Sequence, residues 1–121
     1  MTNKIIRTHF TDKEMDCGCG CKKTVAPELL MQLEALRCLL GKPLSINSGA
    51  RCESHNREVG GKPGSWHLKG LAVDIACKDS NLRGEILRAS IPLGFHGIGI
   101  AKNFIHLDLR PADKGRCWLY S

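Results

Sequence analysis

Two segments of alternating polarity constrain the fold of this chain more than any other feature. In residues 71–76, aliphatic side chains at positions 71, 73 and 75 alternate with small or acidic ones, and Asp74 stands among them. In residues 103–110 the aliphatic positions are 105, 107 and 109, and His106 and Asp108 stand between them. Because successive side chains of a strand point to opposite faces, each segment predicts a strand with one apolar face. If the two strands share a sheet, Asp74 and His106 lie on the same polar face.

The remaining elements indicate an α+β fold. Residues 27–40 predict a helix, because Pro27 suits a first turn, leucines recur at helical spacing and Gly41 follows the last of them. Thr11 and Glu14 have the spacing of a capping box, which predicts a helical turn. We also expect strands at 43–47 and 97–100, helices at 53–59 and 82–89, and a loop at 60–64. Residues 1–121 should form a single domain, with 1–24 as a Cys/Gly-rich lead-in and helices packed on one face of a small, largely antiparallel sheet.

The charge of the chain favours an acidic partner without pointing to nucleic acid. Eighteen Lys and Arg against twelve Asp and Glu give a net charge of +6, but no basic run exceeds Lys22-Lys23. Two Trp, one Tyr and three Phe are few for a surface that stacks bases. We therefore expect no nucleic-acid partner and, for lack of a long apolar run, no membrane span. The first residues lack the apolar segment of a signal peptide, so we expect the chain to be made in the cytoplasm. We also expect it to be a monomer.

Three side chains form a candidate metal site. His67 and Asp74 are seven residues apart, and Gly70 between them permits a turn that brings the imidazole back toward the strand. Together with His106 they supply two imidazoles and one carboxylate, a ligand set typical of catalytic zinc. The alternative is that Asp74 pairs with Arg110 and the two histidines are unrelated.

Three ordered blocks resemble a known family. Residues 65–74 read SWHLKGLAVD and match the pattern Ser-x-His-x-x-Gly-x-Ala-x-Asp of the D-Ala-D-Ala carboxypeptidase family of zinc peptidases (M15-like). That family shares a superfamily with lysostaphin-type endopeptidases and the hedgehog signalling domain. Upstream, residues 48–51 read SGAR and are followed by Asn56; downstream, residues 97–100 read GIGI and 104–108 read FIHLD. The resemblance covers about residues 10 to 118 and implies a hedgehog/DD-peptidase-like fold.

The resemblance also implies roles for single residues. His67, Asp74 and His106 would be the Zn²⁺ ligands. Arg51 would stabilise the oxyanion that forms on the scissile carbonyl, where a fixed guanidinium offers charge and donors. Ser65 would support substrate binding near the metal. The simpler alternatives are a surface salt bridge for Arg51 and a turn cap for Ser65.

One position departs from the pattern of the family. In several members an acidic residue three positions before the last zinc histidine is the general base, and here that position is Asn103. Asp108 and His96 are the candidate substitutes. Asp108 is retained as a catalytic candidate, although it can instead orient His106 or pair with Arg110, and we slightly favour the orienting role.

Seven cysteines are many for a chain of this length. Cys17, Cys19 and Cys21 alternate with glycine, whereas structural zinc sites usually show Cys-x-x-Cys. Related sequences that resemble this one carry cysteines here and at Cys52, which implies a contact between the two regions, either as a disulfide or as metal ligands. Cys38 is expected to pack within its helix.

The sequence thus predicts a zinc metallopeptidase that hydrolyses peptidoglycan stem peptides or cross-links, as a D-alanyl carboxypeptidase or an endolysin-type endopeptidase. Acting on the cell wall would require release from the cytoplasm, for example by phage lysis. A catalytically inactive, zinc-stabilised cell-wall or protein binding module is the alternative, favoured by Asn103. A Cys-rich nucleic-acid binder is a third, favoured only by charge.

Overall fold

In the described part of the chain, five strands form one mixed sheet in the order β1-β2-β4-β3-β5. The structure is a computed structural model that describes residues 8–120. The first three neighbouring pairs are antiparallel and β3–β5 is parallel, so the expected, largely antiparallel sheet is confirmed. The strands are β1 (Ile46–Ser48), β2 (Ala72–Ala76), β3 (Gly97–Ile100), β4 (Phe104–Asp108) and β5 (Arg116–Leu119). The fold class is therefore α+β, as predicted, but β5 was not predicted.

Across residues 8–120, four α-helices and two short 3₁₀ helices accompany these strands. They are α1 (Asp12–Met15), α2 (Pro27–Leu40), α3 (Glu53–Glu58), η1 (Trp66–Lys69), α4 (Ser80–Ser90) and η2 (Ala112–Lys114), and α1 and α2 both precede β1. Helix α2 has the predicted bounds, with Pro27 in its first turn and Gly41 at φ +65° after its end. Helix α4 starts earlier than predicted because the Asp79 carboxylate accepts hydrogen bonds from the backbone N–H groups of Asn81 and Leu82.

The apolar face of the sheet builds the core. Val73 and Ile75 of β2 and Ile105 and Leu107 of β4 are completely buried, as the alternation predicts. They share one cluster with leucines of α2 and with Ile86 of α4. Burying each such side chain stabilises the fold by about 1.5–3 kcal/mol. This face fixes the orientation of both strands, and thereby sends Asp74, His106 and Asp108 to the other side.

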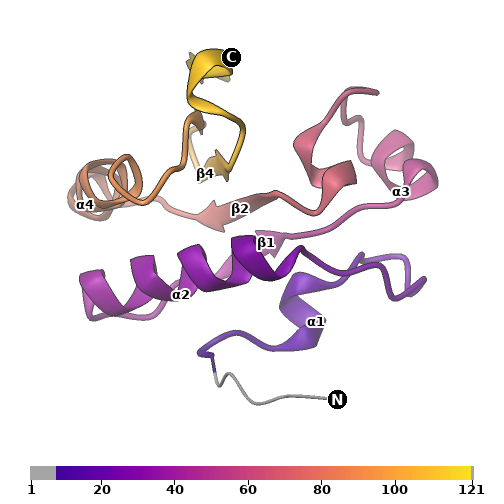
Figure 1. The fold of residues 1–121 in the computed structure, drawn as a ribbon, viewed down its shortest axis with the longest axis horizontal. Helices are drawn as coiled ribbons and strands as arrows, with labels where there is room; N and C mark the ends of the chain where they lie inside the picture. Colours follow the sequence, from indigo (N-terminus) through magenta and orange to yellow (C-terminus); the bar gives the residue numbers. More distant parts are fainter. Residues whose placement is uncertain (1–7, 121) are drawn as a thin grey trace.

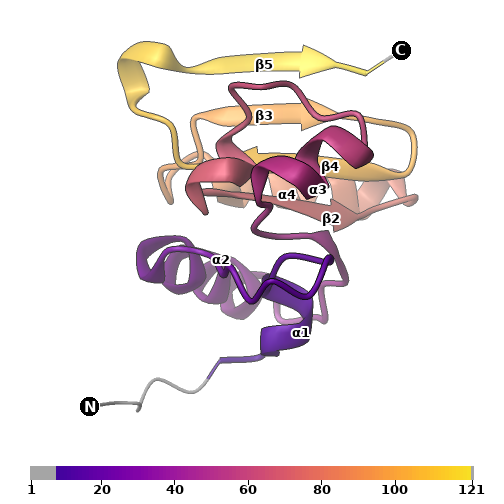
Figure 2. The ribbon, with the colours of Figure 1, turned by 90° about the vertical axis from the view of Figure 1, so that its right-hand side faces the viewer.

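The helices do not all pack on one face, which corrects the prediction. Helix α4 lies on one side of the sheet and α3 lies on the other (Figures 1 and 2). The reason is local: α3 and η1 belong to the segment between β1 and β2 that crosses the polar face and carries His67. Strand β1 begins at Ile46, later than predicted, although the Ser45 carbonyl before it already accepts a hydrogen bond from the Ala76 N–H of β2. In residues 8–120, no helix has the length and apolar character needed to span a membrane.

Candidate metal centre

His67 is presented by a short, capped helical turn. The Ser65 hydroxyl accepts a hydrogen bond from the His67 backbone N–H at the start of η1, and Gly70 ends the turn at φ +71°. The His67 Nδ1 lies 2.7 Å from the carbonyl oxygen of Gly49. A carbonyl can only accept, so Nδ1 donates this hydrogen bond and the other ring nitrogen, Nε2, faces the site. That Nε2 lies 3.2 Å from Oδ1 of Asp74.

The pairing of β2 with β4 brings the second histidine to the same carboxylate. Asp74 and His106 are direct partners in the antiparallel register. His106 Nδ1 lies 3.0 Å from the same Oδ1 of Asp74 that His67 approaches. The three side chains, at 2%, 8% and 6% exposure for His67, Asp74 and His106, are all buried. One ligand atom from each lies within 4.8 Å of the others, so the predicted ligand set is assembled in space.

The outer nitrogen of His106 is held by a buried ion pair. Its Nε2 lies 2.7 Å from Oδ2 of Asp108, and Arg110 donates to Asp108 from Nε at 2.8 Å and from Nη2 at 2.7 Å. Burial tends to raise the pKa of Asp108, but hydrogen bonds from Arg110 and His106 outweigh it and lower that pKa to about 2. An ionised Asp108 therefore accepts a hydrogen bond from His106 Nε2, which turns the other ring nitrogen, Nδ1, toward Asp74.

Two imidazole nitrogens and one carboxylate oxygen thus converge on one point. Burial tends to raise the pKa of Asp74, but contacts with His106 and His67 lower it well below its ordinary value, so the carboxylate is ionised. Burial tends to lower the pKa of His106, but Asp108 and Asp74 outweigh it and raise that pKa. The raised pKa means that, without a metal, His106 favours a proton on Nδ1 that it donates to Asp74, and a metal ion would take the place of that proton. The site therefore demands a proton or a metal ion, and these donors fit Zn²⁺.

Arg51 approaches Asp74 from the opposite side of its carboxylate. Its Nη2 lies 3.2 Å from Oδ2 of Asp74, while Nε donates to Ser48 Oγ and Nη1 donates to Asn56 Oδ1, both at 3.1 Å. Gly61 makes room for this arrangement, since a Cβ there would lie 2.1 Å from Asn56 Oδ1. The guanidinium is therefore fixed beside the ligand set rather than on the surface.

The glycines of β3 open space for the polar face. A Cβ at Gly97 would lie 2.0 Å from Oδ1 of Asp108, and one at Gly99 would lie 2.6 Å from the indole of Trp118. The Trp118 ring centroid lies 5.2 Å from that of His106. Trp118 and Tyr120 were missed by the sequence reasoning because β5 was not predicted. The Gly-Ile-Gly-Ile alternation was the available signal, because it leaves one face of β3 without side chains.

The other sequence candidates lie at different places. Ser65 is half-buried and caps η1, which is the simpler role considered for it. Asn103 is exposed just before β4, and its carbonyl accepts a hydrogen bond from the Cys77 N–H. His96 precedes β3 and its carbonyl accepts from the Arg116 N–H. Neither Asn103 nor His96 belongs to the converging ligand group among the described residues.

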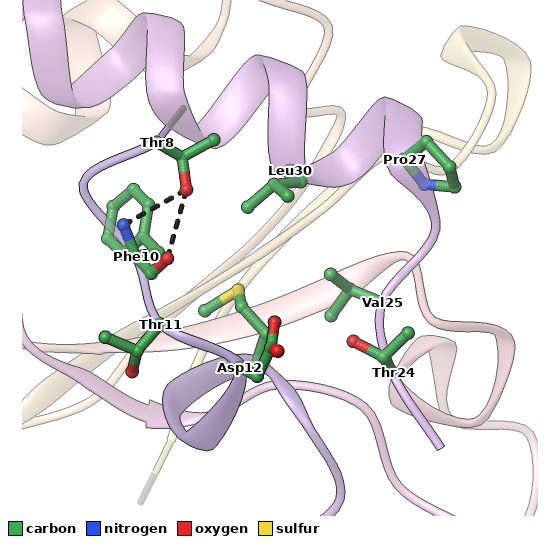
Figure 3. Close-up of a pocket in the computed structure, with 9 residues that line it drawn as sticks. Thr8, Phe10, Thr11, Asp12, Thr24, Val25, Pro27 and Leu30 are labelled. Atoms are coloured by element: carbon green, nitrogen blue, oxygen red, sulfur yellow. Dashed lines mark hydrogen bonds between the residues drawn. The ribbon is translucent and has the colours of Figure 1, made fainter. Parts of the chain in front are cut away.

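A separate hollow of about 380 Å³ lies between the start of the described chain and helix α2 (Figure 3). Phe10, Val25 and Leu30 contribute apolar surface to it, and the Thr8 hydroxyl closes a small turn by donating to the Phe10 carbonyl. None of the converging ligands lines this hollow. We therefore place the chemistry at the polar face of the sheet.

Comparison with known proteins identifies the family of this chain. A family model described as Peptidase M15 matches residues 8–108, a span that contains the ligand group and Arg51 and ends before β5. The match confirms the family that the three sequence blocks indicated. Comparison with curated proteins gave no match.

Proposed function

The chain belongs to the peptidase M15 family, and from that premise we propose that it is a zinc-dependent peptidase acting on the peptide part of peptidoglycan. The observation that carries the proposal is the convergence of His67 Nε2, Asp74 Oδ1 and His106 Nδ1 within 4.8 Å of one another. Three protein ligands leave one coordination position free, which is typical of catalytic rather than structural zinc. Bound there, zinc supplies Lewis acidity and lowers the pKa of water to about 7.

Arg51 is the proposed electrophilic partner in the reaction. Ser48, Asn56 and Asp74 hold its guanidinium from three sides, so it needs no reorganisation when charge develops on a scissile carbonyl. A planar guanidinium keeps its charge at every working pH and offers several donors. We propose that this group stabilises the oxyanion of the tetrahedral intermediate.

Asp108 and Ser65 are proposed to position the ligands. Both oxygens of the Asp108 carboxylate are engaged, by His106 and by Arg110, and the side chain is completely buried. This surrounding favours orientation of His106 over proton abstraction from water. Ser65 caps the turn that presents His67 and, being half-buried, remains a candidate contact for substrate.

Peptidoglycan as substrate rests on the sequence blocks and on charge. The net charge of +6 suits a domain that meets an anionic cell wall. The reaction would release a terminal D-alanine or cleave within stem peptides or cross-links, as an endolysin does. We propose that the chain acts as a monomer on the wall after release from the cell that makes it.

The test combines zinc content with two substrates. The purified chain is loaded with zinc and incubated with a peptide ending in D-alanyl-D-alanine and with cross-linked peptidoglycan, and products are identified by mass spectrometry. Free D-alanine identifies a carboxypeptidase, and shorter or uncoupled peptides identify an endopeptidase. The His67→Ala/His106→Ala variant should lose both the zinc of this site and turnover, because two of three protein ligands are gone. The His96→Ala variant is the control for zinc content. Retention of stoichiometric zinc at this site by the double variant would refute the ligand assignment.

A binding module without catalysis is the second candidate, and two observations favour it. The exposed side chain at the position of the usual general base is Asn103, which cannot take a proton from water. The carboxylate of Asp108 is fully engaged by its neighbours. Binding of the zinc-loaded chain to peptidoglycan without any turnover on either substrate would establish this reading.

A further inference from the structure

Four cysteine sulfurs gather at a second point, separate from the group of His67, Asp74 and His106. Cys17, Cys19 and Cys21 from the lead-in meet Cys52, and one sulfur from each lies within 4.8 Å of the others. The Sγ atoms of Cys17 and Cys19 are 3.4 Å apart, those of Cys19 and Cys52 are 3.6 Å apart, and those of Cys17 and Cys52 are 3.8 Å apart. Cysteines from two regions of the chain, residues 17–21 and position 52, thus place their sulfurs around one small volume.

These separations match a metal site. A zinc–sulfur bond near 2.3 Å places the sulfurs of a tetrahedral site about 3.8 Å apart. A disulfide needs sulfurs at about 2.05 Å, and all four cysteines are free thiols. A cysteine can form a disulfide with only one partner, whereas the Cys52 sulfur contacts two other sulfurs at similar distances.

The backbone around the cysteines is arranged for thiolates. The N–H of Cys52 donates to the sulfur of Cys17, and the N–H of His55 donates to the sulfur of Cys52, each at 3.4 Å. The Cys17 N–H donates to the Lys23 carbonyl at 2.7 Å, and Gly20 adopts φ +87° within the loop that this bond closes. A closed loop with alternating glycines can turn three sulfurs toward one point, which explains why the Cys-x-Cys-x-Cys spacing suffices here.

We propose that Cys17, Cys19, Cys21 and Cys52 bind a second, structural Zn²⁺. Tetrahedral sets of four thiolates select zinc or iron, and a closed set of four protein ligands leaves no position for substrate. The ion would join the lead-in (residues 1–24) to Cys52, which directly follows Arg51. The Ala50 N–H already donates to the Met15 carbonyl at 2.9 Å beside this point. The second zinc thus fastens the lead-in to the segment that carries Arg51.

The experiment counts zinc in the full chain, purified under reducing conditions. Elemental analysis should find about two zinc ions per chain, and about one in the Cys19→Ser/Cys21→Ser variant. Cys117→Ser, an exposed cysteine on β5, is the matched control and should keep both. The His67→Ala/His106→Ala variant should keep one ion, and X-ray absorption should find only sulfur around it at about 2.3 Å. This readout does not depend on turnover, so it stands or falls separately from the peptidase proposal.

Three results would overturn the proposal. The first is a Cys19→Ser/Cys21→Ser variant that keeps two zinc ions. The second is a native chain whose mass is lower by two hydrogens per disulfide among these cysteines. The third is bound iron in place of zinc. If the cysteine variant does not fold, cobalt substitution of the native chain decides, because a four-thiolate site gives intense sulfur-to-cobalt charge-transfer absorption and a histidine–carboxylate site does not.

Discussion

Replacing Asp108 with asparagine separates the two roles that a carboxylate at this position can have. The change keeps the size of the side chain but removes its charge and one acceptor oxygen. In the native structure both oxygens accept hydrogen bonds, from His106 Nε2 at 2.7 Å and from Arg110 at 2.7 and 2.8 Å. An amide must turn its NH₂ group toward one of these donors, which leaves a buried donor unsatisfied at a cost of about 1–3 kcal/mol.

The expected consequence is weaker metal binding with intact chemistry. Loss of such a histidine partner typically lowers metal affinity by roughly 10- to 100-fold, which corresponds to about 1.4–2.7 kcal/mol. Turnover is measured at a series of buffered free-zinc concentrations. The zinc concentration at half-saturation reports the metal affinity, and the plateau reports the rate of the zinc-saturated chain. Asp113→Asn, at an exposed site on η2, is the control. A plateau that falls by 10²–10⁴-fold with unchanged half-saturation would mean that Asp108 is the general base and our reasoning is wrong.

Three further predictions concern Arg51, Gly97 and Asn103. Arg51→Lys should lower turnover by roughly 10²-fold or more while zinc content stays constant, because it removes the planar guanidinium. Unchanged turnover in Arg51→Ala would mean that the Arg51 charge takes no part in catalysis. Gly97→Ala should destabilise the chain by about 1–3 kcal/mol in denaturant titration, because the added Cβ would lie 2.0 Å from the Asp108 carboxylate; unchanged stability would contradict the tight packing of β3 on that carboxylate. Asn103→Glu should raise turnover by on the order of 10²-fold relative to the control Asn103→Gln, since a carboxylate there can accept a proton from the attacking water; equal rates in the two variants would show that position 103 does not reach the reaction.

The parts of the fold that were predictable are those with a local physical signature. Helix α2 could be bounded because Pro27 and Gly41 act at its two ends through their own backbone preferences. Strands β2 and β4 could be identified because one face of each is aliphatic and the other carries polar side chains. Their pairing of Asp74 with His106 then follows from the shared polar face, so the site geometry was largely encoded in two alternating segments.

The parts that were not predictable depend on contacts between distant segments. Strand β5 has no alternation of polarity, and it is positioned by parallel pairing with β3, in which Gly97 lies opposite Arg116. The contact of Trp118 with His106 depends on that pairing. The meeting of Cys17 with Cys52 was implied by the resemblance to related sequences, but the spacing of the cysteines alone does not predict the loop closure that produces it. In each case the residues have ordinary local preferences, and the tertiary structure decides their role.

Charge compensation at the polar face explains how so many ionisable groups can be buried together. The carboxylates of Asp74 and Asp108 are offset by the guanidinium groups of Arg51 and Arg110, at 3.2 Å and 2.7 Å respectively. The two histidines are oriented by Gly49 and Asp108, and each would be neutral as a ligand of a bound metal ion. The protein groups of the site therefore sum to about zero charge, and a bound divalent cation keeps most of its own charge. An electrophile whose charge is not cancelled by its ligands polarises a carbonyl strongly, which is what hydrolysis of a peptide bond requires.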